Sequence, residues 1–290
     1  MSGSLTNDIV SAAPNRRRFL KTLGAATAAV GAISLLDTPS AEAQSTTEID
    51  VLNFALNLEY LEAEFYTYAV TGKSITSFGI GDDGHASGQN PAAGGATTGG
   101  SKVSFSTKDN LIEDLAAEIG VDERAHVALI RSALGKLAVA RPNINLNALG
   151  FGFGSENDFL KASRMLEDIG VSAYSGAAGL LTTPGIITTA GRLLAAEAEH
   201  VGAIRTQVAR LRIATSAMDG ADFTPPPSGK AGQLLSINKS NGLPATRTAG
   251  QVLFLAFGGK ANAKQGGFFP TGLNGSITTS SDVATDKNLA

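Results

Sequence analysis

Two Glu-x-x-His pairs are the part of this sequence best suited to chemistry. Glu123 precedes His126 by three positions, Glu197 precedes His200 by the same step, and the chain contains only three histidines. Residues three apart in a helix share a face, so both side chains of a pair can reach one ion. Each pair also lies on a stripe of apolar residues that recurs at helical spacing. The pattern therefore predicts metal ligands that face the core.

Two more glutamates match each other in two further helical segments. Tyr66 follows Glu59 by seven residues, and Tyr174 follows Glu167 by seven. The order along the chain is thus Glu, Glu-x-x-His, Glu, Glu-x-x-His, which indicates an internal duplication. Any single position of the six would equally suit a carboxylate that reaches water from a helix edge, or a hydrogen-bonded core histidine. All six in this order favour one shared site.

Four carboxylates and two imidazoles in one core need compensating charge, because a single unpaired buried carboxylate costs several kcal/mol. Two divalent cations would balance the four carboxylates. The chain has no cysteine, which excludes disulfides, thiolate zinc sites and iron–sulfur clusters. Because oxygen and nitrogen ligands suit iron or manganese, we expect two Fe or two Mn ions as the cofactor.

Four long segments with helical periodicity would position these side chains. They run from about Ile49 to Thr71, Thr107 to Val139, Glu156 to Leu181 and Thr183 to Leu211. With no strand signal between them, they predict an all-α fold, a four-helix bundle over residues 44–213. Residues 79–107 predict a glycine-rich inserted loop, because the stretch from Gly79 to Gly100 is too rich in glycine for helix or strand.

The composition changes beyond the bundle, and residues 214–290 predict a C-terminal appendage. A short helix is expected within it, at about Ala249 to Phe257. We expect the appendage to pack on the bundle through four phenylalanines: Phe254, Phe257, Phe268 and Phe269. The alternative is a segment that docks onto another subunit, which would make the protein a homo-oligomer.

The first 43 residues have the order of a signal peptide. The basic stretch "NRRRFLK" precedes 15 apolar or small residues, and "AEA" at Ala41 to Ala43 is a small-x-small cleavage site. The apolar run is too short for a bilayer, which needs about 20 residues. The paired arginines resemble the twin-arginine export signal, and an ordinary secretory signal is the alternative. We expect a mature protein that begins at Gln44 in the periplasm or cell envelope, without a stable membrane span.

The ordered set of glutamates and histidines resembles the ferritin-like di-metal carboxylate proteins. Within them, "NFALNLEYLEAEFYTYA" (residues 53–69) and "GGFFPTGLNG" (residues 266–275) look like the ferritin-like branch that includes desiccation-related proteins, and the resemblance covers about residues 46–275. It implies Glu59 and Glu167 as terminal carboxylates, Glu123 and Glu197 as bridging carboxylates, and His126 and His200 as imidazole ligands. Tyr66 and Tyr174 match tyrosines whose hydroxyls orient ligand carboxylates, although ordinary core tyrosines would fit these positions equally well.

Other charged residues of the same segments receive a simpler interpretation. Glu62 shares a helix face with Glu59 and is the alternative ligand from the first segment. Glu64 falls off this stripe and is interpreted, like Glu118 and Glu199, as a solvated or rim charge. His85, within the glycine-rich loop, is expected to be solvent-exposed.

Three functions stay open at this point. The first is a di-metal oxidoreductase that acts on peroxide, oxygen or ferrous iron in envelope stress defence. The second is a desiccation- or stress-related protein with structural metals or none. An iron-storage shell is the third, and the appendage and inserted loop argue against its close packing. Nucleic acid is not expected as a partner, because the formal net charge is -3 and the chain has no basic block after its first 43 residues.

Overall fold

The computed structural model describes residues 46–80, 94–106, 108, 110–228 and 233–285. The expected signal peptide, His85 and Thr107 lie outside these residues, so the structure does not bear on them. Within the described part of the chain, no helix is both long enough and apolar enough to cross a membrane.

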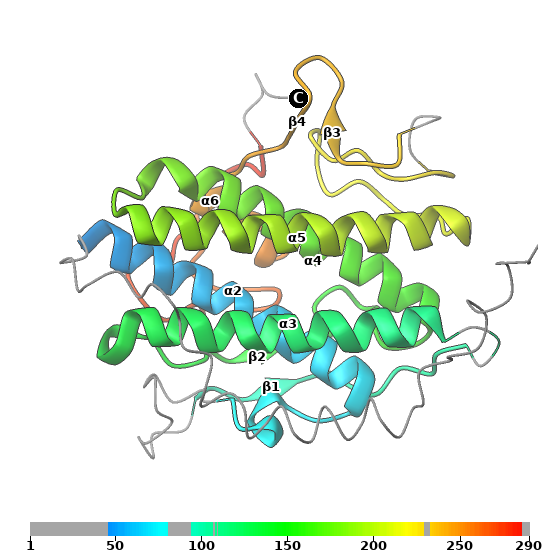
Figure 1. The fold of residues 1–290 in the computed structure, drawn as a ribbon, viewed down its shortest axis with the longest axis horizontal. Helices are drawn as coiled ribbons and strands as arrows, with labels where there is room; N and C mark the ends of the chain where they lie inside the picture. Colours follow the sequence, from blue (N-terminus) through cyan, green and yellow to red (C-terminus); the bar gives the residue numbers. More distant parts are fainter. Residues whose placement is uncertain (1–45, 81–93, 107, 109, 229–232, 286–290) are drawn as a thin grey trace, which may run out of the picture. The chain divides into compact units, whose positions relative to one another are not determined.

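Four long helices form the bundle, which confirms the predicted all-α fold (Figure 1). They are α2 (Thr46–Thr71), α3 (Leu111–Leu134), α4 (Glu156–Ala177) and α5 (Pro184–Arg210). Helix α2 packs mainly against α3, and α4 packs mainly against α5. The apolar core between the helices includes fully buried side chains from each of them, such as Leu56, Ile119, Phe159 and Ile204.

Local signals set the helix ends where the sequence carries them. The Ser155 hydroxyl accepts a hydrogen bond from the Asp158 N–H and caps α4, and Pro184 occupies the first turn of α5. The second helix is shorter than expected, because Gly135 takes a positive φ of 56° after α3 and a 3₁₀ turn follows over Gly135–Leu137. The third helix likewise ends before Leu181, in a 3₁₀ turn at Ala178–Leu180.

Short strands occur in two places where none was expected. Strand β1 (Thr97–Thr98) pairs in parallel with β2 (Ile144–Asn145), and β3 (Ile237–Asn238) pairs antiparallel with β4 (Leu243–Pro244). The expectation that Gly79 to Gly100 forms no strand is therefore wrong near its end. A 3₁₀ turn at Ile75–Phe78 precedes this stretch.

The C-terminal segment carries helix α6 (Ala249–Ala256), close to the expected bounds. Phe257, Phe268 and Phe269 are buried, whereas Phe254 is only partly buried and does not serve as the anchor that we expected. Hydrogen bonds from the backbone of the segment join it to the bundle helices, among them the following two. The Arg247 N–H donates to the Ser172 carbonyl of α4, and the Asn274 N–H donates to Oδ1 of Asn57 in α2.

Candidate metal centre

The six glutamates and histidines predicted as ligands meet in the middle of the bundle. They form two overlapping groups, each with ligand atoms that all lie within 4.8 Å of one another: Glu59, Glu123, His126 and Glu197, and Glu123, Glu167, Glu197 and His200. We call these six residues the carboxylate–histidine cluster. Glu123 and Glu197 belong to both groups, so their carboxylates lie between the two positions that an ion could take. All six side chains are buried.

Each histidine of the cluster turns Nδ1 toward the carboxylates. Nδ1 of His126 lies 3.3 Å from Oε2 of Glu59, 3.4 Å from Oε2 of Glu123 and 3.7 Å from Oε1 of Glu197. Nδ1 of His200 lies 3.0 Å from Oε1 of Glu123 and 3.3 Å from Oε2 of Glu167. The two imidazole rings are 6.0 Å apart and nearly parallel, with an interplanar angle of 24°.

Two tyrosines, the buried Tyr66 and the partly buried Tyr174, hold the outer oxygens of the terminal glutamates. The Tyr66 hydroxyl donates to Oε1 of Glu167 at 2.5 Å, and the Tyr174 hydroxyl donates to Oε1 of Glu59. Burial and the adjacent carboxylates raise the pKa of both phenols well above their usual value, so both remain hydrogen-bond donors. The second oxygen of each glutamate is left to face a histidine.

The inward atoms of the cluster have no hydrogen-bond partner in the described part of the chain. They are Oε2 of Glu59 and Glu167, both oxygens of Glu123 and Glu197, and Nδ1 of His126 and His200. Buried polar atoms in native proteins are almost always satisfied, because an unsatisfied one loses its hydration without replacement. Carboxylate oxygens and imidazole nitrogens are ligands that iron and manganese accept. The donor set therefore fits two metal ions.

Protons must take the place of cations in the metal-free cluster. Burial raises the pKa of Glu123 to about 7 and, together with the Glu123 charge, raises that of Glu197 well above its usual value. Burial lowers the pKa of His126, but Glu59 and Glu123 outweigh this and raise it to about 11. The cluster thus retains positive charge, as protons on its own ligand atoms, at neutral pH.

Glu62 lies beside the cluster but belongs to neither group of four. It is buried, and burial and the Glu197 charge raise its pKa well above the usual value. It faces Gly170 of α4, where an added Cβ would lie 3.3 Å from Oε1 of Glu62 and would collide with the Glu197 carboxylate. Glu62 and Gly170 also line two largely apolar pockets, both together with Leu58. The geometry thus favours Glu59 over Glu62 as the cluster residue of α2.

The interpretation of Glu64 as a solvated charge is wrong. Glu64 is fully buried, pairs with Arg141 and accepts a hydrogen bond from the Ser74 hydroxyl at 2.8 Å. The chain that follows α2 and the connection between α3 and α4 cover this side of the helix, which the periodicity of α2 alone does not show. Glu118 and Glu199 are exposed, as expected.

Sequence reasoning also missed Asp122, which directly precedes the first Glu-x-x-His pair. Its Oδ2 lies 3.3 Å from Nε2 of His200, the ring nitrogen that points away from the cluster. An acidic residue next to a ligand glutamate was a signal that could have been noted.

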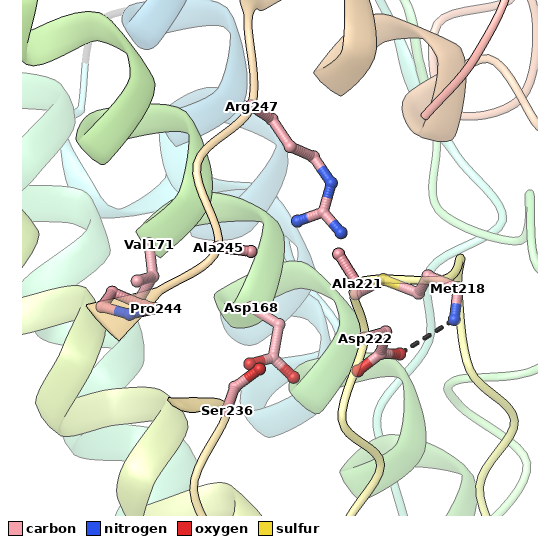
Figure 2. A pocket seen from close by; sticks show the side chains of 9 residues that line it. All are labelled: Asp168, Val171, Met218, Ala221, Asp222, Ser236, Pro244, Ala245 and Arg247. Atoms are coloured by element: carbon pink, nitrogen blue, oxygen red, sulfur yellow. Dashed lines mark hydrogen bonds between the residues drawn. The ribbon is translucent and has the colours of Figure 1, made fainter. Parts of the chain in front are cut away.

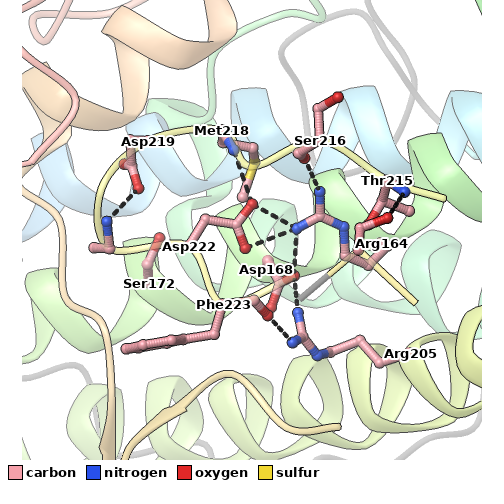
Figure 3. Close-up of polar contacts among 12 residues, drawn as sticks. Arg164, Asp168, Ser172, Arg205, Thr215, Ser216, Met218, Asp219, Asp222 and Phe223 are labelled. Carbon is pink, nitrogen blue, oxygen red and sulfur yellow. Dashed lines mark hydrogen bonds and ion pairs between the residues drawn. The ribbon is translucent and has the colours of Figure 1, made fainter. Parts of the chain in front are cut away.

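A second group of charges lies on α4 where the C-terminal segment crosses it. Asp168 accepts hydrogen bonds from Arg205 at 2.7 Å and Arg164 at 3.3 Å, and Arg164 also pairs with Asp222 at 2.6 Å (Figure 3). A small pocket beside them is lined by Asp168, Asp222 and Arg247 (Figure 2). These charges pair with one another or with neighbouring loops, so the group joins the C-terminal segment to the bundle.

A helical bundle that gathers acidic and histidine side chains in its core defines a ferritin-like protein whose buried groups could hold metal ions. Residues 47–210 match the family model of the ferritin-like domain, and the chain belongs to this family. Over 176 residues it is 28% identical to the desiccation-related protein PCC13-62 of Craterostigma plantagineum. The aligned region covers 55% of this chain and 52% of that protein. The match thus spans about half the length of this relative. No solved structure matches.

Proposed function

We propose that this protein binds two iron or two manganese ions in the carboxylate–histidine cluster. Glu59 and His126 would hold one ion, Glu167 and His200 the other, and Glu123 and Glu197 would contact both. The observation that carries the proposal is the set of buried, unpartnered ligand atoms, which face one another across the bundle. Two divalent ions would balance the charge of the four carboxylates.

We infer an oxidoreductase that handles peroxide, oxygen or ferrous iron. Two redox-active ions, when bound, would supply the electrons for such a reaction. The chain's own residues provide the setting: Tyr66 and Tyr174 fix the terminal glutamates through their hydroxyls, and burial keeps bulk water from the cluster. Among the residues that the structure describes, the two facing histidines contact the carboxylates of Glu123 and Glu197, and no other hydrogen bond prevents these carboxylates from shifting.

A stress-related protein with structural metals, or with none, is the second candidate. The similarity to a desiccation-related protein favours it. Peroxide consumption and ferrous-iron oxidation by the protein loaded with iron, and separately with manganese, decide between the two. The oxidoreductase proposal requires rates above those of the metal-free protein and of free metal in at least one assay. Rates equal to free metal in all of them would leave the structural role.

We further propose that the protein is exported through the twin-arginine pathway to the periplasm or cell envelope. The proposal rests on "NRRRFLK" and "AEA" in the first 43 residues. Replacing Arg16 and Arg17 by Lys should trap the precursor in the cytoplasm, where immunoblots of cell fractions would detect it. Normal export of this variant would refute the twin-arginine assignment and leave an ordinary secretory signal.

A further inference from the structure

The two halves of the carboxylate–histidine cluster are built alike. Each contributes one glutamate, one tyrosine and one Glu-x-x-His pair, and their contacts are reciprocal. Tyr66 of the first half binds Glu167 of the second, and Tyr174 of the second binds Glu59 of the first. Each histidine contacts the glutamate of the other pair as well as a terminal glutamate. Inside the cluster, the two positions for an ion therefore have equivalent ligands.

The equivalence ends at the outer side of the histidines. Nδ1 of His200 faces the carboxylates, so in a metal-ligating imidazole the hydrogen resides on Nε2. This Nε2 lies 3.3 Å from Oδ2 of Asp122, which accepts its hydrogen bond. Asp122 directly precedes Glu123, and the residue that directly precedes Glu197 in the second half is Ala196.

The histidine of the first half has no such acceptor. Alanine offers no side-chain hydrogen-bonding group, and the polar contacts of His126 with described residues are all made through Nδ1, not through Nε2. One imidazole of the pair is thus held from both sides, and the other is held only from within the cluster. The two halves of the cluster, which otherwise match, therefore differ in the residue that contacts the outer nitrogen of the histidine.

A carboxylate on the outer N–H of a ligating imidazole fixes its tautomer and ring orientation and makes it a better donor to metal; losing such a partner typically costs about 10–100-fold in metal affinity. We infer that Asp122 is a positioning residue that makes the two metal positions unequal. The position at His200, with Glu167, fills first and more tightly, and the position at His126, with Glu59, fills second. This inference rests on the proposed function. The side chain of Asp122 is 48% exposed, which places the expected effect nearer tenfold.

The test is a titration of the metal-free protein with Mn²⁺, in which electron paramagnetic resonance measures the free ion. The wild type should bind two ions in two steps whose affinities differ by about tenfold or more. Asp122→Ala, which installs the residue of the second half, should weaken only the tighter step, by about tenfold. Ala196→Asp should tighten the weaker step. Glu199→Gln removes an exposed carboxylate next to His200 and should change neither.

Structure determination with one equivalent of Mn²⁺ gives a second readout, since anomalous scattering should place the ion at His200 in the wild type. The inference would be overturned if the wild type binds both ions with equal affinity, or if the first ion lies at His126. It would also be overturned if Asp122→Ala, folded as judged by circular dichroism, binds Mn²⁺ as the wild type does. If Asp122→Ala does not fold, Ala196→Asp still tests the inference. An affinity of the weaker binding step that is the same in Ala196→Asp as in the wild type would overturn the inference. A wild-type protein that binds no Mn²⁺ or Fe²⁺ would instead refute the proposed metal centre itself.

Discussion

Each histidine of the carboxylate–histidine cluster commits its inner nitrogen to carboxylates on more than one helix. Nδ1 of His200 reaches Glu123 of α3 and Glu167 of α4, so this one imidazole joins three helices at the cluster. Its loss should affect the ion at that position most, because the other position keeps His126 and Glu59. The surrounding helices keep their apolar contacts, which do not depend on the imidazole.

We therefore expect His200→Gln to bind about one ion per chain with wild-type affinity and to lose most of its affinity for the other. Its far-ultraviolet circular dichroism should remain that of a folded helical protein. Metal analysis after equilibrium dialysis measures the first quantity, with Glu118→Gln as a control for an exposed side chain on α3. A variant that still binds two ions as tightly as the wild type would remove His200 from the ligand set.

The pH dependence of stability should change sign when metal is bound. In the metal-free protein the pKa of Glu123 is raised from 4.5 to about 7. Because the folded state binds this proton more tightly than the unfolded state does, protonation of Glu123 stabilises the folded protein. The stabilisation is complete below pH 4.5, the pKa of the unfolded chain, and it is lost as the pH rises through about 7. The melting temperature of the metal-free protein should thus fall between about pH 4.5 and about pH 7 and level off above that.

The metal-loaded protein should behave in the opposite way. Bound ions require deprotonated ligands, so their affinity rises with pH, and an ion that binds only the folded state raises its stability. Thermal unfolding of both forms across this range, at a fixed excess of metal, makes the comparison. Parallel pH profiles for the two forms would show that the ions do not bind at the protonated carboxylates.

The six cluster residues could be singled out from the sequence because the spacing within each Glu-x-x-His pair and each Glu–Tyr step is a local property of one helix, although most contacts in the cluster join different helices. Glu123 with His126 and Glu59 with Tyr66 are read directly from positions on one helix face. The environment of Glu64 could not be predicted in this way, since its partner Arg141 stands 77 positions further along the chain. The contact between Asp122 and His200 joins residues 78 positions apart and was missed for the same reason.

Helix α4 approaches the cluster closely because Gly170 lies one turn after Glu167. A Cβ at this position would collide with the Glu197 carboxylate and would lie 3.3 Å from Glu62. Both obstacles are ends of flexible side chains and not backbone, so an added methyl group would move carboxylates more readily than helices. Gly170 is therefore needed for the placement of Glu197, while the helix itself would accept alanine.

Gly170→Ala should fold, and the metal-free form should be no less stable than the wild type, because alanine favours a helix over glycine by about 1 kcal/mol. Its metal affinity should fall by tenfold or more, since Glu197 contacts both ion positions. Gly191→Ala in α5 is the matched control: its added methyl group meets no atom within 4 Å. Isothermal titration with Mn²⁺ compares the variants, and equal affinity in Gly170→Ala and the control would contradict this role.

The helices were easier to predict than their ends or the strands between them. Long apolar stripes indicated α2 to α5, and Pro184 marked the start of α5. The ends of α3 and α4 depend on single 3₁₀ turns, which periodicity does not reveal. Strands β1 and β2 have only two residues each, one within the glycine-rich loop and one after α3, so neither shows an alternating pattern of its own.

The attachment of the C-terminal segment depends on buried ion pairs as well as on phenylalanines. Asp222 of the segment accepts two hydrogen bonds from the Arg164 guanidinium, at 2.8 and 2.6 Å (Figure 3). Both side chains are almost completely buried. Removing one member of such a pair leaves a charge in a poorly solvated place, which makes this contact much more important than a surface ion pair.

Asp222→Asn should destabilise the protein by about 3 kcal/mol, the lower end of the range for a broken buried pair, because Asp168 remains next to Arg164. Lys161→Gln breaks a partly exposed pair with Asp158 on the same helix and should cost less than about 1 kcal/mol. Urea unfolding followed by circular dichroism measures both. Similar losses in the two variants would show that the buried pair does not hold the segment.

The central claim is that one folded chain holds two metal ions between its four long helices. Elemental analysis of the mature protein, reloaded with iron or with manganese and freed of excess ions, tests it most directly. The account predicts close to two ions per chain in the wild type, and close to none in a variant in which Glu123 and Glu197, shared by both positions, are replaced by Ala. A metal-replete wild-type protein that contains one ion per chain, or none, would contradict it.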